Sequence, residues 1–467
     1  MNEHITFIIV GATGDLARRR LFPALYSLLK HGKMPQKWFI IGVALEDKEP
    51  SAILAGAREF IEEFDEQTWH DFIQHFWYKK TDFSVQKNVA ALAALITDLE
   101  QKKYNQTGNR IIYLAIPPQF FVPVTEAFAQ HSLIKKAGKN ELQQPWCRVV
   151  YEKPFGQDRA SAHEMNIRIS HYLEESQIFR VDHYLAKDIV GTLALVRFTN
   201  RVFEPLWNGE NIDWIEIALR ETVCVDGRGA YYDTYGALKD VVQNHMMQIV
   251  ALLAMEAPCS LSGDAIRDQV TCILQKIRPV DGFLGQYDGY KQEPGVASAS
   301  TTETFAAVKL MIDTPRWNQV PFYITTGKCL SKKETIITVQ FKPVACLLTS
   351  SCPSEANKLT IRILPEPGFS LELNVKKPGM FVEVMPVSMD FCYECRFGSV
   401  KGNTYELVLQ EVMVGEQSIS VRFDEIEYAW EVIQKIKDLN LPLYDYKKDT
   451  NGPEELKDFV QKNGMRW

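Results

Sequence analysis

The chain has 467 residues, 46% of them hydrophobic and 24% charged, and a net charge of −7. These proportions are typical of a soluble globular protein with two or three domains, and they exclude a disordered chain, collagen or a coiled coil. The acidic balance lacks the basic footprint of a nucleic-acid binder. No apolar run approaches the roughly 20 residues of a membrane span. We therefore expect neither nucleic acid nor a membrane as a partner.

The first 175 residues alternate short β-type runs with longer helical patterns, which is typical of a parallel sheet built from βαβ units. We predict strands over residues 5–10, 39–43, 111–115 and 148–152. Helices are predicted over residues 16–31 and from a capping box at Ser161 to about residue 173. Residues 1–175 are thus predicted to form a doubly wound, Rossmann-like dinucleotide-binding domain.

Residues 176–467 follow a different pattern. Segments 335–341, 359–364 and 369–375 alternate apolar with polar residues, which indicates an antiparallel sheet with one wetted face. Residues 236–255 form a helical pattern that carries several polar residues. We predict a larger α+β domain with a mainly antiparallel sheet, packed on the first domain with the site between them.

The nine cysteines are scattered and odd in number, which indicates reduced core thiols and a cytoplasmic protein. Cys392 and Cys395 form a CxxC pair. With no second pair and no nearby histidine, we interpret them as strand thiols rather than a zinc or redox site. No metal site is expected.

A glycine-rich turn follows the first predicted strand and reads Gly11-Ala12-Thr13-Gly14-Asp15-Leu16-Ala17. It opens a helix, so its backbone N–H groups suit a pyrophosphate at the helix N-terminus, and Arg18 to Arg20 add cations. The spacing departs from GxGxxG, and an ordinary strand-turn-helix remains the alternative.

The end of the second strand bears on the choice of cofactor. An acidic side chain there accepts hydrogen bonds from a free ribose, whereas an arginine accommodates a 2′-phosphate. This chain has Leu45-Glu46-Asp47, which favours NAD unless the acids are merely solvated.

Two further segments carry reactive side chains. Glu152-Lys153-Pro154 ends a predicted strand, and the bond before Pro154 is either cis or trans. Downstream, the segment Arg180-Val-Asp182-His183-Tyr184-Leu-Ala-Lys187 is either an anion and base site or a solvated loop.

The helical pattern over residues 236–255 contains His245 among apolar neighbours. This histidine is either a base or a satisfied core residue. Asp240, Asn244 and Gln248 lie along the same pattern.

Together these segments resemble the glucose-6-phosphate dehydrogenase family. In family order the chain has GATGDLA, EKPFGQD, RVDHYLAKD, GRGAYYDTYGALKDVVQNHMMQ, STTETFAAVKL, VPFYITTGKCL and KKPGMF. The matches span nearly the whole chain, which resembles a member of bacterial length.

The resemblance implies oxidation of D-glucose 6-phosphate at C1 to 6-phospho-D-glucono-1,5-lactone, with hydride transfer to NAD or NADP. This is the first step of the oxidative pentose phosphate pathway. The resemblance also implies a homodimer or a dimer of dimers, formed through the antiparallel sheet.

The roles of individual residues follow from the same resemblance. His245 is the expected general base and Asp182 its carboxylate partner. The expected substrate-binding residues are Lys153, His183, Tyr184, Lys187, Glu221, Asp240, Lys328 and Lys333. The expected cofactor-binding residues are Gly11, Ala12, Thr13, Gly14, Asp15, Leu16, Arg20, Glu46, Ala115, Pro117, Pro118, Glu152 and Lys153.

The chain departs from the family pattern at several positions, among them Arg20, where the family often has lysine. Ala186 and Asp188 replace a glycine and a glutamate, which leaves the expected ligands intact. NADP-using members carry an arginine in the segment aligned with Leu45-Glu46, so both cofactors stay open. The alternatives are a related dehydrogenase acting on a different or unphosphorylated sugar, and a catalytically inactive nucleotide-sensing homologue.

Overall fold

The computed structural model describes residues 4–138, 145–182, 184–185, 187–344, 356–379, 384–398 and 404–464. The chain divides into two compact units. Unit 1 comprises Met1–Ala186, Ser260–Arg267 and Gly402–Phe423, and unit 2 comprises Lys187–Cys259, Asp268–Lys401 and Asp424–Trp467. The first boundary lies after the expected one at residue 175, because β6 (Ile178–Val181) pairs with the sheet of unit 1.

In the part of the chain that the structure describes, unit 1 contains six strands and the helices that flank them. The strands are β1 (His4–Val10), β2 (Lys37–Ala44), β3 (Phe76–Lys80), β4 (Asn109–Leu114), β5 (Cys147–Glu152) and β6. The helical elements are η1 (Ala17–Leu21), α1 (Phe22–Lys30), α2 (Pro50–Arg58), α3 (Glu66–Gln74), α4 (Gln86–Tyr104), η2 (Pro118–Phe120), α5 (Phe121–Gln130), α6 (Arg159–Ser170), η3 (Glu175–Gln177) and α12 (Thr404–Val414).

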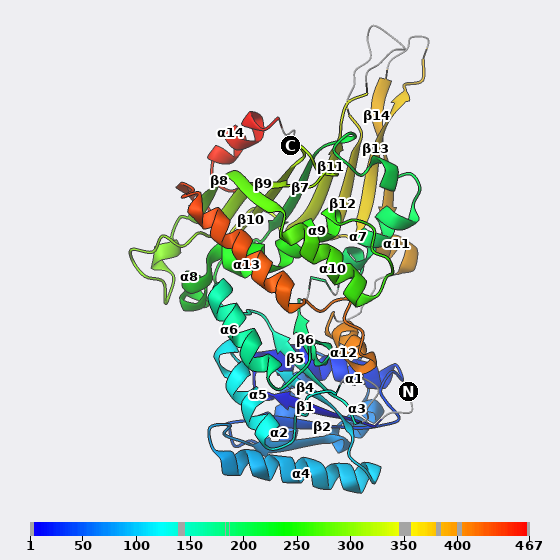
Figure 1. Cartoon of the computed structure of the whole chain (residues 1–467), viewed down its shortest axis with the longest axis vertical. Helices are drawn as coiled ribbons and strands as arrows, with labels where there is room; N and C mark the ends of the chain where they lie inside the picture. Colours follow the sequence, from blue (N-terminus) through cyan, green and yellow to red (C-terminus); the bar gives the residue numbers. More distant parts are fainter. Residues whose placement is uncertain are drawn as a thin grey trace. The chain divides into compact units, whose positions relative to one another are not determined.

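The sheet of unit 1 has the order β3-β2-β1-β4-β5-β6, and every pairing is parallel. Strands β1 and β4 are buried along their length, as expected for a sheet covered on both faces. Helices α1, α3 and α12 pack on one face, and α4, α5 and α6 pack on the other (Figure 1). The predicted doubly wound domain is confirmed.

Two local details of unit 1 differ from the prediction. The helix predicted over residues 16–31 begins with the π-helical turn η1 and continues as α1. The capping box at α6 is formed by Asp158 and Ser161, because the Ser161 N–H donates to the Asp158 side chain at 2.8 Å. Ser161 is therefore the third residue of the helix and not its cap.

Unit 2 is built on a nine-stranded sheet. Its strands are β7 (Ile212–Arg220), β8 (Ile277–Tyr287), β9 (Phe305–Ile312), β10 (Pro321–Gly327), β11 (Glu334–Phe341), β12 (Lys358–Leu364), β13 (Gly368–Lys376), β14 (Val384–Cys392) and β15 (Leu443–Tyr446). Its helical elements are α7 (Asp188–Thr199), η4 (Glu204–Leu206), α8 (Gly229–Ala237), η5 (Leu238–Met246), α9 (Met247–Ala254), η6 (Tyr290–Gln292), α11 (Tyr393–Phe397) and α14 (Glu455–Lys462), while α10 (Gly263–Leu274) and α13 (Phe423–Asp438) begin in unit 1 and continue in unit 2.

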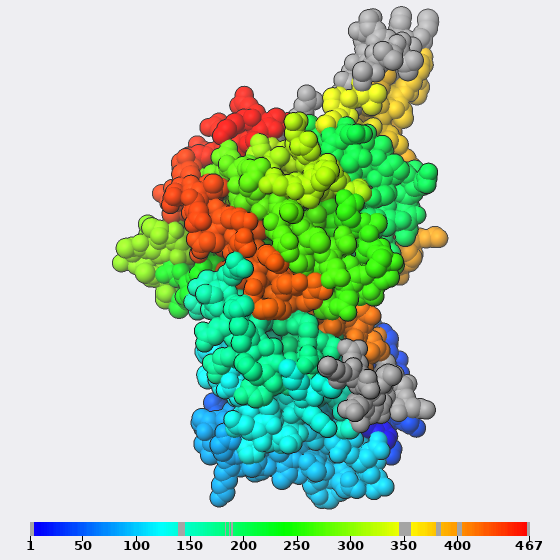
Figure 2. All heavy atoms as spheres, viewed as in Figure 1, coloured from blue at the N-terminus to red at the C-terminus, as the bar shows by residue number. Residues whose placement is uncertain are grey.

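The strand order in unit 2 is β14-β13-β12-β11-β7-β10-β9-β8-β15. The β7–β10 and β8–β15 pairs are parallel and the other pairs are antiparallel, so the prediction of a mainly antiparallel sheet is confirmed. Strands β13 and β14, yellow and gold, extend from the rest of unit 2 (Figures 1 and 2). Most of β14 is exposed, which leaves an open sheet end.

The prediction of reduced cysteines is wrong for two pairs. Cys224 is bonded to Cys329, and Cys392 to Cys395. The first pair joins positions 105 residues apart, which spacing along the chain does not reveal. Cys147, Cys259 and Cys272 are free thiols. Among the helices of the described ranges, none combines the length and apolar character needed to cross a membrane.

Candidate active site

The glycine-rich turn lies where the sheet order of unit 1 reverses, between the ends of β1 and β4. The Gly11 N–H donates to the Val43 carbonyl oxygen at 2.8 Å. Gly11 has φ +87°, and a Cβ there would lie 2.2 Å from the Ala115 carbonyl oxygen. Only glycine fits this turn. The carboxyl edge at such a switch point, beside a helix N-terminus, fits a dinucleotide pyrophosphate.

Much of the positive charge of the arginine run beside this turn is already paired with protein side chains. Arg18 and Arg19 each form an ion pair with the same Asp15 carboxylate oxygen at 3.0 Å. Both guanidinium groups also lie over the Phe60 ring. Arg20 is close enough to Tyr405 to oppose the rise in that phenol's pKa caused by burial. The local cations are therefore partly committed to protein partners.

Glu46 lies beside the glycine-rich turn. Hydrogen bonds from the Lys48 ammonium and the Thr13 side chain lower the pKa of Glu46, with Lys48 making the larger contribution. The Lys48 Nζ atom is 2.7 Å from the carboxylate. Tyr78 donates its hydroxyl to the Glu46 carbonyl oxygen at 2.5 Å and so anchors the backbone. An ionised acceptor at this place suits a ribose hydroxyl.

The Glu152-Lys153-Pro154 segment leaves β5 at the same edge of the sheet. Tyr113 donates a hydrogen bond to the Glu152 carboxylate at 2.5 Å. Burial raises the pKa of Glu152 to about 7, although hydrogen bonds from Tyr113 and Tyr405 and the Lys153 charge oppose the rise. The peptide bond between Lys153 and Pro154 is cis, which resolves the open alternative.

Asp182 and Tyr184 belong to the turn that follows β6. Asp182 is buried, and its Oδ1 atom accepts a hydrogen bond from the Tyr184 N–H at 2.9 Å. His183, named as a substrate ligand, lies outside the described residues.

The helical segment of unit 2 that carries His245 is bent and anchored at its start. Gly236 has φ +63°, and a Cβ there would lie 2.4 Å from the Glu303 carboxylate. Glu303 accepts hydrogen bonds at 3.0 Å from two N–H groups, that of Leu238 at its side chain and that of Ala237 at its carbonyl oxygen. This anchor fixes where η5 begins.

His245 is 3% exposed and lies near the end of η5. Asn244 donates to the Asp240 carbonyl oxygen at 3.0 Å and accepts from the His245 N–H at 2.7 Å. The Asp240 side chain accepts a hydrogen bond from the Tyr231 hydroxyl at 3.3 Å. The predicted residues Asp240 and His245 are thus held on one short helical segment.

Glu221 and Lys328 follow the neighbouring parallel strands β7 and β10. Gly327 is in register with Arg220, so the next residue of each strand leaves the sheet at the same edge. The Lys328 Nζ atom is 2.6 Å from the Glu221 carboxylate. Both residues are predicted substrate ligands, and the structure brings them together.

Lys187 and Lys333 lie close enough to affect each other. Burial and the nearby Lys333 charge lower the pKa of Lys187 to about 8, burial being the larger cause. Two ammonium groups that repel each other would gain from a bound anion, because the anion relieves their repulsion.

The predicted residues divide between the two units. Unit 1 contains the cofactor set together with Lys153, Asp182 and Tyr184, and unit 2 contains Lys187, Glu221, Asp240, His245, Lys328 and Lys333. Because Asp182 and His245 belong to different units, their partnership stays a prediction. In the described ranges, no cluster of three or more His, Cys, Asp or Glu side chains is placed to hold a metal ion.

Sequence reasoning missed Tyr405, Glu303 and the Cys224–Cys329 bond. Tyr405 interacts with Glu152 from α12, far along the chain. Glu303 lies within the STTETF motif, but its contacts at Gly236 are visible only in the fold. No spacing rule could have found these partners.

A parallel sheet of this order, with a glycine turn at its switch point and a second unit carrying a buried histidine, is typical of a nicotinamide dinucleotide-dependent oxidoreductase. Two family descriptions match the two halves of the chain. The glucose-6-phosphate dehydrogenase NAD binding domain matches residues 8–191, and the C-terminal domain matches residues 194–467. The chain belongs to the glucose-6-phosphate dehydrogenase family.

The chain is similar to glucose-6-phosphate 1-dehydrogenases over nearly their full length. Glucose-6-phosphate 1-dehydrogenase of Aggregatibacter actinomycetemcomitans is 36% identical, covering 100% of this chain and 97% of the relative. The enzyme of Bacillus subtilis is 35% identical, with coverage of 98% and 97%.

Solved structures give the same result. A glucose-6-phosphate dehydrogenase in complex with glucose 6-phosphate matches with a TM-score of 0.91 and 30% identity, covering 100% of this chain and 99% of the other. Levoglucosan dehydrogenase in complex with NADH and L-sorbose matches with a TM-score of 0.52 and 10% identity, covering 93% and 96%, which is a likeness of fold alone.

Proposed function

We propose that this chain oxidises D-glucose 6-phosphate at C1 to 6-phospho-D-glucono-1,5-lactone, the first step of the oxidative pentose phosphate pathway. Within a chain of this family, the observation that carries the proposal is the Lys187–Lys333 pair. Paired ammonium groups suit a phosphate monoester, whereas an unphosphorylated sugar offers them no charge. This pair therefore favours the phosphorylated substrate over the alternative of a free sugar.

His245 is the proposed general base for the C1 hydroxyl. Imidazole can accept a proton near neutral pH, and removing this proton helps C1 to release a hydride. Asp182 is its proposed carboxylate partner, which would orient the ring and stabilise the imidazolium. A bound nicotinamide dinucleotide supplies the hydride acceptor.

The remaining predicted residues bind and orient the substrate. Lys187 and Lys333 would bind the phosphate together with His183 and Tyr184. Glu221, Asp240 and Lys328 would hold sugar hydroxyls, and the 2.6 Å Lys328–Glu221 pair keeps both groups at the strand ends. Lys153 would bridge the sugar and the nicotinamide.

A direct assay tests the activity and the alternatives. Cofactor reduction is followed at the absorbance of the reduced nicotinamide. We expect reduction with glucose 6-phosphate and a far slower reduction with glucose. Comparable kcat/KM values for the two sugars would favour the alternative of an unphosphorylated substrate. If no hexose phosphate supports cofactor reduction, the remaining alternative is a catalytically inactive, nucleotide-sensing homologue.

The proposed cofactor preference is NAD used at least as well as NADP. The support is Glu46, an ionised carboxylate beside Thr13, which would repel a 2′-phosphate and accept hydrogen bonds from a ribose. The measurement is the pair of kcat/KM values with glucose 6-phosphate. A ratio that favours NADP by orders of magnitude would refute the preference.

We also propose a cytoplasmic homodimer or dimer of dimers, formed at the open end of the sheet. The apolar side chains Met385, Val387 and Met389 alternate along β14 and are exposed, Met389 by 61%. A relative from Solanum tuberosum is a cytoplasmic isoform. Met389→Glu should shift the mass in sedimentation velocity toward the monomer, and an unchanged mass would place the interface elsewhere.

A further inference from the structure

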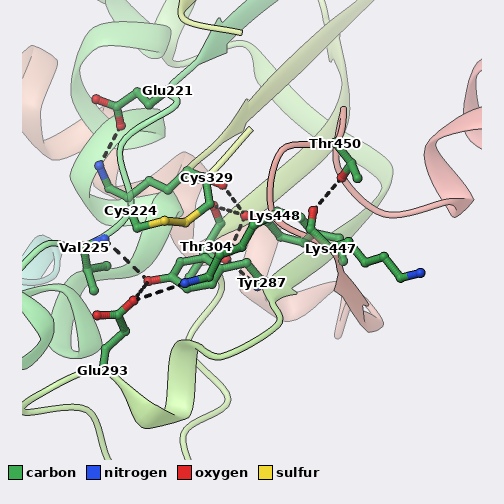
Figure 3. The surroundings of a disulfide bond; sticks show 12 residues. Glu221, Cys224, Val225, Tyr287, Glu293, Thr304, Cys329, Lys447, Lys448 and Thr450 are labelled. Carbon is green, nitrogen blue, oxygen red and sulfur yellow. Dashed lines mark hydrogen bonds and ion pairs between the residues drawn. A yellow bond between two sulfur atoms is a disulfide. The ribbon is translucent and has the colours of Figure 1, made fainter. Parts of the chain in front are cut away.

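Cys224 and Cys329 join two turns at one edge of the sheet in unit 2 (Figure 3). Their Cα atoms are 4.7 Å apart, and the bond links residues separated by 105 positions. Cys224 lies in the turn after β7, and Cys329 in the turn after β10. A disulfide in a reducing compartment is typically transient and redox-sensing rather than structural.

The same two turns carry the proposed sugar ligands. Cys329 directly follows Lys328, and Cys224 lies three residues after Glu221. Figure 3 shows Glu221 on the same side as Cys224 of the disulfide. The Lys328 Nζ atom lies 2.6 Å from the Glu221 carboxylate. A bond between the two turns therefore restrains the groups that would hold the sugar.

The two turns are not equally well anchored. The turn after β10 is held by a third segment, because the Lys328 carbonyl oxygen accepts from the Tyr446 hydroxyl at 2.7 Å. The Cys329 carbonyl oxygen also accepts from the Asp449 N–H at 2.9 Å.

The turn after β7 is bonded mainly to the turn after β10, and one long bond, from the Val225 N–H to the Tyr287 hydroxyl at 3.5 Å, joins it to a third segment. The Val223 carbonyl oxygen accepts from the Cys329 N–H at 3.2 Å, and the Val223 side chain is exposed. Glu221 itself has two backbone hydrogen bonds, from its N–H to the Gly327 carbonyl oxygen at 3.0 Å and from the Leu330 N–H to its carbonyl oxygen at 2.9 Å, and both join it to the neighbouring strand and turn. The Lys328 backbone bonds to Thr304 and Tyr446 in other segments. Loss of the disulfide should therefore loosen the turn after β7 more than the turn after β10.

We propose that Cys224 and Cys329 form a reversible thiol–disulfide switch, whose oxidised state holds Glu221 beside Lys328 for sugar binding. The proposal rests on the substrate roles proposed above for these two residues. Cys224 is partly exposed, whereas Cys329 is 1% exposed. Cys224 is thus the sulfur that an external reagent reaches first.

Oxidation of the dithiol takes two exchange steps with a low-molecular-weight disulfide. The Cys224 thiolate attacks one sulfur of that disulfide, forms a mixed disulfide and releases one thiolate. The Cys329 thiolate then attacks the Cys224 sulfur and releases the second thiolate. Two electrons and two protons pass from the protein thiols to the small disulfide, and a dithiol reverses the sequence through the same sulfur.

Reduction should act on substrate affinity more than on turnover. The turns bear Glu221 and Lys328, whereas His245 lies on η5, whose start is anchored by Glu303. We expect the KM for glucose 6-phosphate to rise about three- to tenfold, as when one charge-assisted hydrogen bond is weakened. The kcat should change less.

The test uses the full-length enzyme equilibrated with glutathione disulfide or with dithiothreitol. Mass spectrometry of unreduced peptides should detect the Cys224–Cys329 link only after oxidation, and the KM should follow the linked fraction reversibly. Cys224→Ser should have the KM of the reduced enzyme in both buffers. Cys392→Ser removes the Cys392–Cys395 disulfide, and this control should keep the response.

The switch would be overturned by a missing link after oxidation, by a KM that does not change with the linked fraction, or by a response that Cys224→Ser retains. Lys328→Ala separates this failure from a failure of the proposed site. If Lys328→Ala raises KM while Cys224→Ser does not, the sugar site stands and the switch is wrong; if Lys328→Ala leaves KM unchanged, the assigned role of the turn is wrong, and the switch with it.

Discussion

The two regions proposed to bind phosphate groups are built in different ways. In unit 1, contiguous residues form a backbone turn at a helix N-terminus, and the adjacent Arg18 and Arg19 are both paired with Asp15. In unit 2, Lys187 and Lys333 come from distant segments, and the charge of one lowers the pKa of the other. The first region relies on backbone geometry and the second on side-chain charge, so different substitutions should damage them.

Loss of the base in unit 2 should have the largest effect. His245→Asn keeps a polar side chain of similar reach but cannot accept the C1 proton near neutral pH. We expect kcat to fall by about 10²- to 10⁴-fold, with little change in the dissociation constant of glucose 6-phosphate measured by calorimetry. His70→Asn, on the exposed face of α3, is the matched control. An unchanged kcat would remove His245 from the mechanism.

Adding a single methyl group to the glycine-rich turn of unit 1 should abolish dinucleotide binding. Gly11→Ala places a Cβ 2.2 Å from the Ala115 carbonyl oxygen at φ +87°. The left-handed backbone alone costs about 1–3 kcal/mol, and the clash moves the turn away from the pyrophosphate. We expect nicotinamide dinucleotide binding, measured by fluorescence quenching, to be lost.

Gly32→Ala separates these two causes. Gly32 has φ +66°, and an added methyl group there would meet no atom within 4 Å, so this substitution keeps the strain and omits the clash. This variant should lose some thermal stability and still bind the dinucleotide. Equal losses of binding in both variants would show that the turn fails through general destabilisation.

The contrast between the regions also explains what the sequence could predict. The glycine turn and the strands β1, β2, β4 and β5 depend on neighbours in the chain, so the sequence pattern predicted them and the structure confirms them, whereas β3 and β6 were not predicted. The partners of Asp15 and Glu46 lie within a few residues, yet side-chain geometry was needed to find them. Local sequence thus predicts the backbone of this region and leaves its charge balance open.

Contacts between residues far apart in the chain could not be predicted from local sequence patterns. Cys224 and Cys329 meet only because β7 and β10 are parallel neighbours, which depends on the order of nine strands. The Glu303 contact at Gly236 and the Tyr405 contact at Glu152 also join residues far apart in the chain, so they too depend on the whole fold. The resemblance nevertheless named Glu221 and Lys328 together, because it drew on a whole motif set rather than on spacing.

The lysine pair of unit 2 should respond to loss of charge and to pH. Lys187→Ala or Lys333→Ala should raise the KM for glucose 6-phosphate about 10- to 100-fold, since a charged hydrogen-bond partner is lost. Lys332→Ala, at the exposed neighbouring position, should have little effect.

The sign of the pH effect follows from the pKa of Lys187, about 8. The ammonium is charged below this pH and neutral above it, so phosphate affinity should fall as pH rises through 8. Lys187→Arg keeps its charge and should flatten the profile of KM against pH. A wild-type profile that stays flat to about pH 9.5, more than one unit above this pKa, would place the phosphate elsewhere.

The smallest expected effect concerns Glu46 in unit 1. Glu46→Gln keeps the size of the side chain and removes the charge that opposes a 2′-phosphate, while Lys48 loses its 2.7 Å partner and becomes available to an anion. The ratio of kcat/KM for NADP to that for NAD should therefore rise about 5- to 20-fold. Asp47→Asn removes one charge from the adjacent exposed position and should change the ratio much less. If both variants shift the ratio equally, the preference comes from the general acidity of this edge; if only Glu46→Gln does, one side chain in an otherwise backbone-built region selects the cofactor by its charge.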